Sequence, residues 1–428
     1  MFKESFLHFI WQYQYFNTID LRSSSGDELL IINIGTHNHH EGPDFKGAHI
    51  QFNGLDWHGS IEIHRKASDW YSHRHEVDSN YDNVILHVVW EYDRDVIRND
   101  ESIIPALELK GKIKPGIIRR YKAIIASKTT IPCEELFRNV RPITKLSMLE
   151  KVLVQRLQLK SGTLLEILKS KRRNWEETAY QWLGMGFGFK TNAKAFQELT
   201  KKAPLKLIQK HTSSQLQIEA LLFGQAGFLL EDCKLPYSMS LYKEYEFLRA
   251  KYQLGGSMYR AQWTFGSVRP ANYPLRRISQ FASFLTQEPN IFSFFTQREN
   301  IKNIDAFLNV KASDYWTNHI DFEKSSIDRK SALSKTAIEN LIINVTVPFL
   351  VALWQDRREE HYLQSAQELL MQLGPEKNNI LSTWKSLGWN VSNAYDSQGL
   401  IQLYNNYCKD KRCLDCSIGL ELIRTKDN

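Results

Sequence analysis

The dipeptide Asn53-Gly54, set between two stretches of alternating apolar and polar residues, constrains the fold of this chain more than any other feature. Both central residues of a type I′ turn need a positive φ angle, which Asn and Gly adopt most easily, so the pattern predicts a tight β-hairpin. Closing the turn sets the register of the two strands and pairs Phe52 with Leu55, Ile50 with Trp57, Ala48 with Gly59 and Phe45 with Glu62.

The second strand of this hairpin separates apolar from polar side chains, because successive side chains point to opposite faces of a strand. One face carries apolar residues and the other carries imidazole and carboxylate groups: Trp57, Ile61 and Ile63 against His58, Ser60, Glu62 and His64. The polar face predicts a metal-binding or acid–base site. Strict alternation turns Asp44, at the mouth of the first strand, to the wrong face. A bulge or bend near Gly42-Pro43 must therefore re-aim it.

Nine of the 13 histidines fall between His37 and His87. Imidazole combined with carboxylate suits Mn²⁺, Fe²⁺ or Zn²⁺, whereas carboxylates alone suit Mg²⁺. If the Gly35–Gly42 loop folds over the hairpin, five side chains converge on one metal site: His37, His39, Asp44, Glu62 and His64. Two other histidines, His73 and His75 near Asp69 and Asp78, are exposed candidates, whereas His8, His49 and His87 are expected to be packing residues.

Pro43-Asp44, the hairpin and Glu62-Ile63-His64 together resemble the core motif of the PD-(D/E)XK nuclease superfamily. The resemblance implies that Asp44 and Glu62 hold a divalent metal, Mg²⁺ or Mn²⁺ with Zn²⁺ as the alternative. In the superfamily, a Lys two residues after the Glu helps to activate water and to stabilise the transition state. Here His64 stands in that position, and a neutral imidazole can act as base or metal ligand but is not a permanent cation. The catalytic residues implied are Asp44, Glu62 and His64.

Segments along nearly all 428 residues also resemble domain-of-unknown-function family 2851, a full-length bacterial family found mostly in Bacteroidota. The segments that carry this resemblance are Gly42–Phe45, Gly59–His64, Ser68–Trp70, Leu86–Val89, Glu219–Gly227, Arg269–Pro274 and the C-terminal cysteines. The family implies no established activity, so the chemistry has to come from the residues themselves.

Three of the five cysteines, Cys408, Cys413 and Cys416, lie within nine residues near the end of the sequence. Thiolates at this spacing bind Zn²⁺ or an iron–sulfur cluster, and both centres usually take four ligands. Cys133 is the first choice for the fourth ligand, ahead of Cys233. Some nucleases of the superfamily named above hold their core with an iron–sulfur cluster built from one distant and three clustered cysteines, which is similar in pattern but not in spacing. The alternative is that the cysteines are free and reduced.

The net charge of +7 is unevenly distributed along the chain. Residues 1–130 hold 15 Lys and Arg against 18 Asp and Glu, whereas residues 141–280 hold 23 against 10. This asymmetry suits a nucleic acid that is held by one part and processed by another. Three arginines in a basic turn that leads into a helix could grip phosphates: Arg269, Arg276 and Arg277. The alternative is that they cap and bridge helices.

The chain as a whole predicts an α+β protein. An N-terminal mixed β-sheet module with a flanking helix, similar to a nuclease core, is expected over residues 1–112, and a connector over 113–135. A large all-α domain is expected over 136–428. A small β-barrel or sandwich is the alternative for the first module. Within the helical domain, the apolar stretch Ala337–Trp354 predicts a buried central helix with a kink at Pro348.

The composition, 42% apolar and 24% charged, is typical of soluble globular proteins. No apolar stretch approaches the roughly 20 residues of a membrane span, and the first residues lack the cleavage site of a signal peptide. We therefore expect a cytoplasmic protein without a membrane partner, of undefined oligomeric state. The function predicted is metal-dependent phosphodiester hydrolysis by a nuclease-like protein acting on nucleic acid. A non-enzymatic scaffold that binds nucleic acid or protein is one alternative, and a metal-dependent hydrolase for another substrate is a second.

Overall fold

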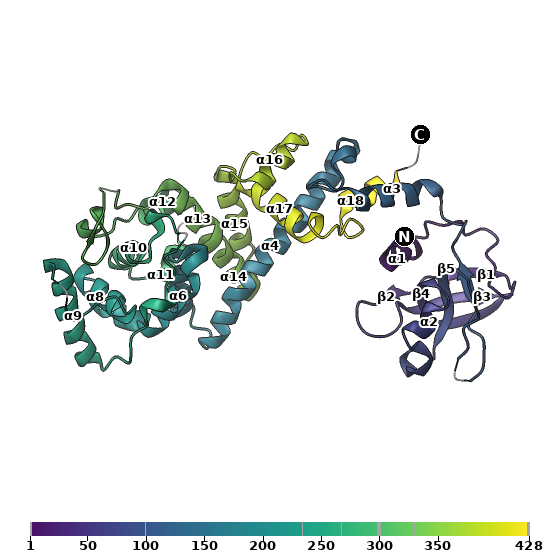
Figure 1. Ribbon diagram of the computed structural model, residues 1–428, viewed down its shortest axis with the longest axis horizontal. Helices are drawn as coiled ribbons and strands as arrows, with labels where there is room; N and C mark the ends of the chain where they lie inside the picture. Colours follow the sequence, from purple (N-terminus) through teal and green to yellow (C-terminus); the bar gives the residue numbers. More distant parts are fainter. Residues whose placement is uncertain are drawn as a thin grey trace. The chain divides into compact units, whose positions relative to one another are not determined.

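The computed structural model describes residues 2–98, 100–232, 234–266, 268–297, 301–327 and 330–425 (Figure 1). The chain forms two compact units: the first comprises Met1–Met148 and Leu403–Asn428, and the second comprises Leu149–Gln402. The predicted α+β class is confirmed, because the first unit contains a mixed sheet and the second is largely helical. The division differs from the predicted boundaries, since the first unit extends to Met148 and also takes up the C-terminal segment.

The first unit is built on a six-stranded mixed sheet with the order β1-β3-β4-β5-β6, in which β2 also pairs with β3 (Figure 1). Strand β3 is antiparallel to β1, β2 and β4, whereas β4, β5 and β6 are parallel to one another. The elements are α1 (Glu4–Gln12), β1 (Leu29–Asn33), β2 (Thr36–His37), β3 (Phe45–Phe52), β4 (Leu55–Lys66), α2 (Asp69–Ser72), β5 (Val84–Glu91), β6 (Ala106–Glu108), α3 (Pro115–Ala126) and α18 (Ser417–Arg424).

The predicted hairpin is confirmed as the β3–β4 pair. Asn53 and Gly54 have φ angles of 48° and 82°, as a type I′ turn requires. Three of the predicted cross-strand pairs are present: Phe52 with Leu55, Ile50 with Trp57 and Ala48 with Gly59.

The fourth predicted pair is wrong, because Phe45 lies opposite Ile61 rather than Glu62. The register shifts by one residue between Phe45 and Ala48, and Gly47 within that interval has a φ of 70°. A glycine with positive φ is typical of a β-bulge, which adds one residue to one strand and reverses the faces beyond it. The bulge therefore lies inside β3 rather than near Gly42-Pro43, and it turns Asp44 to the face of Glu62.

The crossover from β4 to the parallel strand β5 covers the polar face of the hairpin. It contains α2, and Trp70 of this helix is 2% exposed in a small apolar cluster with Ala67, Val84 and Val89. This cluster fixes the turn that follows α2 against the sheet. The polar face of β4 is consequently covered by protein rather than fully open to solvent.

The second unit is an assembly of packed helices (Figure 1). Helix α4 (Pro142–Ser170) leads into it, and the other elements are α5 (Trp175–Phe187), α6 (Phe189–Lys202), α7 (Leu205–Ile208), α8 (Gln215–Gln225), α9 (Pro236–Tyr252), α10 (Pro274–Gln287), α11 (Ile291–Thr296), α12 (Ile301–Leu308), β7 (His319–Asp321), β8 (Lys324–Ser325), α13 (Lys335–Leu341), α14 (Val347–Arg357), α15 (Glu360–Gln372), α16 (Asn379–Ser386) and α17 (Ala394–Leu403).

Glycines permit close helix crossings in this unit. A Cβ atom at Gly184 would lie 2.5 Å from Thr200 Cγ2, and one at Gly224 would lie 2.1 Å from the ring of Tyr245. Larger residues at these positions would force the helices apart.

Helix Lys335–Arg357 accommodates Pro348 with a π-helical turn over Ile342–Thr346, between α13 and α14. A proline removes one backbone donor and crowds the preceding turn, and the wider π turn relieves this crowding. Among the described residues, this 23-residue segment is the one helix that is long and apolar enough to cross a membrane. The expectation that no segment has this composition is therefore wrong here. In the helical core, however, 78% of its apolar window is buried.

Candidate metal centre

Asp44 and Glu62 meet across the bulged hairpin. The N–H of Asp44 donates to Glu62 Oε2 at 3.1 Å, and the N–H of Ile63 donates to Asp44 Oδ2 at 3.0 Å. The side chain of Glu62 is only 7% exposed, whereas that of Asp44 is 20% exposed. The two carboxylates therefore form one group, and solvent reaches this group from the side of Asp44.

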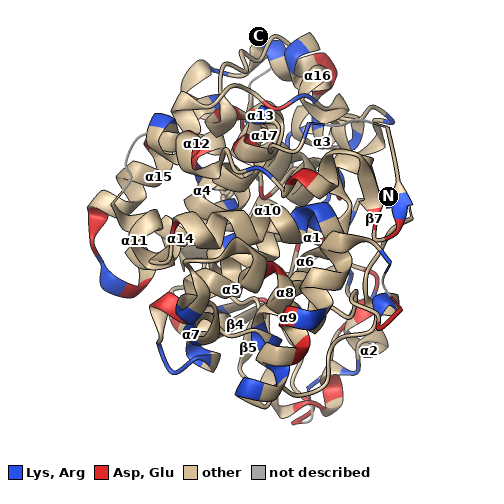
Figure 2. Ribbon diagram, turned by 90° about the vertical axis from the view of Figure 1, so that its left-hand side faces the viewer, with Lys and Arg blue, Asp and Glu red and all other residues tan. Residues whose placement is uncertain are grey.

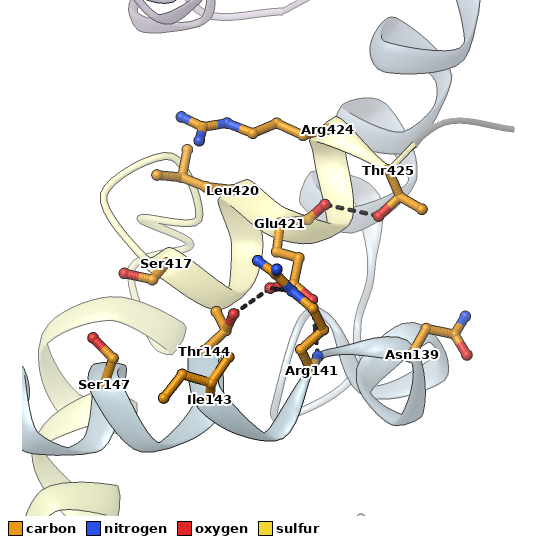
Figure 3. A pocket seen from close by; sticks show the side chains of 10 residues that line it. All are labelled: Asn139, Arg141, Ile143, Thr144, Ser147, Ser417, Leu420, Glu421, Arg424 and Thr425. Atoms are coloured by element: carbon orange, nitrogen blue, oxygen red, sulfur yellow. Dashed lines mark hydrogen bonds and ion pairs between the residues drawn. The ribbon is translucent and has the colours of Figure 1, made fainter.

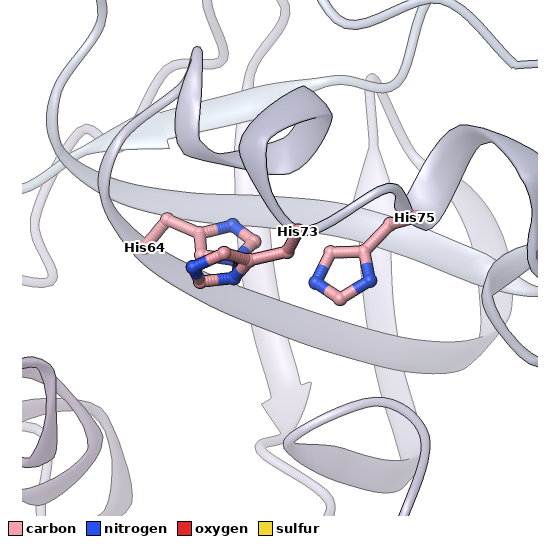
Figure 4. A group of neighbouring side chains, drawn as sticks. All are labelled: His64, His73 and His75. Carbon is pink, nitrogen blue, oxygen red and sulfur yellow. Dashed lines mark hydrogen bonds between the residues drawn. The ribbon is translucent and has the colours of Figure 1, made fainter.

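Three imidazoles gather beside Glu62: His64 from β4, and His73 and His75 from the turn after α2 (Figure 4). His64 Nε2 lies 3.0 Å from His73 Nδ1 and 3.5 Å from Glu62 Oε1. His75 Nε2 lies 3.4 Å from the same Glu62 oxygen. Each of the three rings can offer one nitrogen within 4.8 Å of the other two. Three nitrogens thus converge, and a Glu62 oxygen lies beside two of them.

The backbone of the turn brings His73 and His75 to the same ring of β4 (Figure 4). Arg74, between them, has φ 61° and ψ 35°. A residue other than glycine is uncommon in this left-handed region, and the conformation costs on the order of 1 kcal/mol. Tyr81 stacks on the His75 ring with 3.8 Å between centroids, and the edge of Trp70 meets that ring at 5.3 Å. These aromatic contacts hold the strained turn in place.

Burial sets the protonation of this cluster. Burial lowers the pKa of His64 far below its usual range, and the neighbouring imidazoles lower it further. Burial also lowers the pKa of His75. The same burial raises the pKa of Glu62 well above its usual value, and the adjacent Asp44 carboxylate adds to this increase. Neutral imidazoles keep the lone pairs that bind metals, and a cation here would offset the cost of a buried carboxylate.

The spacing of the three imidazoles allows them to share one metal ion, because each offers a nitrogen within 4.8 Å of the other two. Zn–N bonds of about 2.0–2.1 Å place tetrahedral ligands about 3.3 Å apart, and His64 Nε2 and His73 Nδ1 are 3.0 Å apart. Glu62 lies outside this group of three, with an oxygen 3.5 Å from His64 Nε2 and 3.4 Å from His75 Nε2. A nitrogen-rich donor set suits Zn²⁺, Fe²⁺ or Mn²⁺, whereas Mg²⁺ prefers six oxygens. The residues present therefore fit one of the first three ions.

His87 lies behind the cluster on β5, in register with Glu62, and is fully buried. Its Nε2 lies 2.8 Å from His64 Nδ1, and burial lowers the pKa of His87 to about 3. When His64 Nδ1 donates to this neutral ring, the lone pair of His64 Nε2 faces His73. His87 can therefore orient a metal-binding imidazole, as hydrogen-bond partners behind metal ligands commonly do. The buried, hydrogen-bonded position was predicted; its contact with His64 was not.

Two side chains of α1, His8 and Glu4, also reach the site, although the sequence did not predict them as part of it. His8 Nε2 lies 3.2 Å from Asp44 Oδ2. Burial lowers the pKa of His8, but the contact with Asp44 and the nearby carboxylates together raise it above its usual value. Glu4 lies one helical turn earlier, and burial raises its pKa. The spacing of Glu4 and His8, four residues apart on one helix face, was the signal that could have identified them.

The Gly35–Gly42 loop brings His37 only to the edge of the site. The His37 ring stacks on Phe45 with 4.8 Å between centroids and lies 5.4 Å from the His8 ring. His39 is exposed and lies 4.4 Å from His37. The imidazoles that join His64 beside the buried carboxylate are instead His73 and His75, from the turn after α2.

The four cysteines predicted as ligands of one centre, Cys133, Cys408, Cys413 and Cys416, are buried in the first unit. Among the described residues, no three of their sulfur atoms lie within 4.8 Å of one another. A negative charge on a neighbouring sulfur raises the pKa of Cys133, Cys408 and Cys413. Cys233, the alternative fourth ligand, lies outside the described residues.

The three arginines expected to contact nucleic acid have different surroundings. Arg276 and Arg277 of α10 are 5% and 3% exposed. Arg276 Nη2 donates to the carbonyl oxygen of Trp316 at 2.5 Å, and Arg277 Nη1 donates to Gln280 Oε1 at 2.8 Å. The first contact joins α10 to the 3₁₀ helix Asp314–Thr317, and the second lies within α10. Arg269 is exposed and is the member of this trio that lies on the surface.

The chain belongs to the family described as "Protein of unknown function (DUF2851)", whose model matches residues 4–379. The match spans the histidine–carboxylate cluster and most of the helical unit, and it ends before the three clustered cysteines. Searches of the curated proteins and of the solved structures found no match.

Proposed function

We propose that this member of the family hydrolyses phosphodiester bonds of nucleic acid with a divalent metal ion held beside Glu62. The convergence of His64, His73, His75 and Glu62 next to the Asp44 carboxylate carries the proposal. The sheet adds support, because an antiparallel hairpin followed by a crossover to a parallel strand agrees with the resemblance to the PD-(D/E)XK core.

A metal ion bound here would lower the pKa of a coordinated water and stabilise negative charge on the phosphate. The three imidazoles and Glu62 would bind it, and His87 would hold His64 in the required orientation. Asp44 lies on the more exposed side, where its carboxylate can bind the metal or accept a proton from the attacking water.

His8 offers a cation where the motif lacks its usual Lys. Burial keeps the imidazole of His64, at the Lys position, uncharged. The nearby carboxylates, Asp44 above all, raise the pKa of His8 despite its burial, so the charged form of His8 is favoured. An imidazolium at this place would stabilise the phosphate charge that develops during attack.

The basic excess of residues 141–280 supports a polyanionic substrate. In Figure 2, Lys and Arg are interspersed with Asp and Glu along helices such as α9. Such a surface attracts phosphates through general electrostatics rather than through one dedicated patch. Binding of nucleic acid should therefore weaken as the salt concentration rises.

The experiment compares wild-type protein with Glu62→Gln, Asp44→Asn and Asp56→Asn in Zn²⁺, Mn²⁺ or Mg²⁺. Substrates are single- and double-stranded DNA and RNA. We expect cleavage by wild-type protein and a loss of at least about 100-fold in the first two variants. Asp56→Asn is the matched control, because Asp56 lies on the same hairpin and accepts from Gln51 Nε2 at 2.9 Å. Cleavage that all three variants retain would refute the proposal.

The same donor set serves hydrolysis of other esters, so a second substrate series separates these activities. Bis(4-nitrophenyl) phosphate, 4-nitrophenyl phosphate and 4-nitrophenyl acetate report on phosphodiester, phosphomonoester and carboxylic ester hydrolysis. Metal-dependent turnover of the last two compounds, without cleavage of nucleic acid, would replace the nuclease proposal with a different hydrolase. Metal binding without turnover of any substrate would favour a binding protein.

A further inference from the structure

Four buried thiols, contributed by two segments far apart in the sequence, lie together in the first unit. Cys133 precedes a short 3₁₀ helix at Glu134–Asn139, whereas the other three lie between the end of the π turn Tyr404–Cys408 and the start of α18. Their exposed fractions are 7–9%. Burial raises the pKa of Cys133, Cys408 and Cys413, and charges on the neighbouring sulfurs raise it further. The geometry agrees, because Cys133 and Cys416 immediately precede the 3₁₀ helix Glu134–Asn139 and α18, and these two helices contact each other.

The loop between the cysteines is shaped by tight backbone contacts. The N–H of Lys411 donates to the carbonyl oxygen of Cys408 at 3.1 Å, and the N–H of Leu420 donates to that of Cys416 at 2.8 Å. A Cβ atom at Gly419 would lie 2.2 Å from the carbonyl oxygen of Cys413. Since only glycine permits this approach, α18 is pressed directly onto the loop that carries the thiols.

Polar contacts hold the same segment on both sides of the thiols. The Lys411 ammonium donates to the carbonyl oxygens of Ile125 and Ser127, both at 2.7 Å, close to the chain that leads to Cys133. Figure 3 shows α18 against the start of α4, in a pocket of about 700 Å³. There Glu421 accepts hydrogen bonds from the backbone N–H of Arg141 at 2.8 Å and from the hydroxyl of Thr144.

We infer that Cys133, Cys408, Cys413 and Cys416 bind one iron–sulfur cluster, which fastens the C-terminal segment to the N-terminal unit. Four thiolates around one Zn²⁺ would lie about 4 Å apart, but no three of these sulfur atoms lie within 4.8 Å of one another in the described part of the chain. The thiolates of a cluster bind different iron atoms and can lie farther apart, and a closed set of four protein ligands is typical of a structural site. Binding requires the thiols to lose their protons. The positive charge of Lys411 favours the thiolate form of Cys413.

This centre is independent of the histidine–carboxylate cluster, because the two share no residue. Metal bound by four thiolates contributes its binding free energy to folding, since the ligands are not pre-assembled in the unfolded chain. The clamp would connect residue 133 with residues 408–416. Its loss should therefore free the C-terminal segment first and leave the helical unit folded.

The test is metal analysis of full-length protein purified with and without exclusion of oxygen, followed by dialysis against EDTA. We expect about four Fe per chain, with visible absorbance, to remain. Cys133→Ser and Cys413→Ser should each lose this metal. Cys233→Ser and Glu62→Gln should each retain it, which separates this centre from the proposed hydrolytic site.

A thiol reagent keeps the test decisive if the cysteine variants fail to fold. p-Hydroxymercuribenzoate added to wild-type protein should release the metal stoichiometrically, detected with a chelating dye, and limited proteolysis should then cut near residues 403–425 first. Wild-type protein that retains no Fe, or that retains Zn instead, would overturn the inference. Full retention of the metal in Cys133→Ser would overturn it as well.

Discussion

The histidine–carboxylate cluster and the cysteine cluster belong to the same unit but are constructed differently. The nitrogens of the first cluster come from the short interval His64–His75, on strand β4 and the turn after α2. Asp44, beside this cluster, is partly exposed. The second joins Cys133 to Cys408–Cys416, and all four of its thiols are buried. Metal sites with an open position are typically catalytic, and closed sites of four protein ligands are typically structural.

Accessibility is the basis for the different roles proposed for the two clusters. Both offer several donors, but only the first leaves a side from which water and substrate can approach. Removal of ligands should therefore abolish activity at the first cluster and reduce stability at the second.

Chelation should produce the largest difference. Dialysis against 1,10-phenanthroline should remove the metal from the partly exposed histidine cluster and reduce hydrolysis by at least about 100-fold, and added Zn²⁺ or Mn²⁺ should restore it. The melting temperature should change little, because the buried thiolate metal stays bound. Activity and differential scanning calorimetry measure the two effects on one sample. A loss of stability without a loss of activity would reverse the assignment.

Replacement of the imidazole ligands should weaken metal binding by at least about 10–100-fold, since even partners behind a ligand contribute this much. The variants are His73→Ala and His75→Ala, measured by competition with a metal-binding dye. His58→Ala is the matched control, because His58 is an exposed imidazole on the same strand and stacks on His49 at 4.0 Å. Equal affinities in all three variants would exclude the turn after α2 from the site.

His87 should influence the metal only through His64, so its replacement has a smaller predicted effect. His87→Ala removes the ring that lies 2.8 Å from His64 Nδ1 and should lower metal affinity by about 10-fold. The number of metal ions bound at saturation should stay the same as in wild-type protein. A complete loss of binding would instead identify His87 as a ligand.

Stability should depend on pH through a second group besides the thiolate centre. This group is a buried amine in the second unit that has no metal-binding role. Lys160 Nζ donates to Asn344 Oδ1 at 2.8 Å and to Gln398 Oε1 at 3.1 Å, and burial lowers its pKa to about 7. Above pH 7 the amine loses its proton in the folded chain but keeps it in the unfolded chain, so the free energy of unfolding rises with pH. The gain between pH 7 and pH 8 should be about 1 kcal/mol.

Thiolate metal binding also strengthens as pH rises, so the variant Lys160→Met separates the two contributions. Urea denaturation at pH 6, 7, 8 and 9 should show a flatter profile for this variant than for wild-type protein. The gain that remains should disappear after the thiolate metal is removed. An unchanged profile in Lys160→Met would show that the buried amine is not responsible for the rise.

The parts of the fold that the sequence alone determined are those encoded by neighbouring residues. Asn53-Gly54 specifies the turn of the hairpin, because the positive φ angles it requires are a property of those two residues. Alternation then specifies which side chains of β4 share a face, and Glu62 and His64 do share one. The close spacing of Cys408, Cys413 and Cys416 likewise pointed to one cluster.

Only the tertiary structure decided which of these faces and segments meet. The one-residue bulge at Gly47 turns Asp44 toward Glu62, and the packing of α2 on the sheet brings His73 and His75 to His64. These outcomes depend on contacts between segments that are separated along the chain, and no repeating pattern of residues in the sequence indicates such contacts. Backbone preferences are local, whereas burial and convergence depend on the free energy of packing the whole unit.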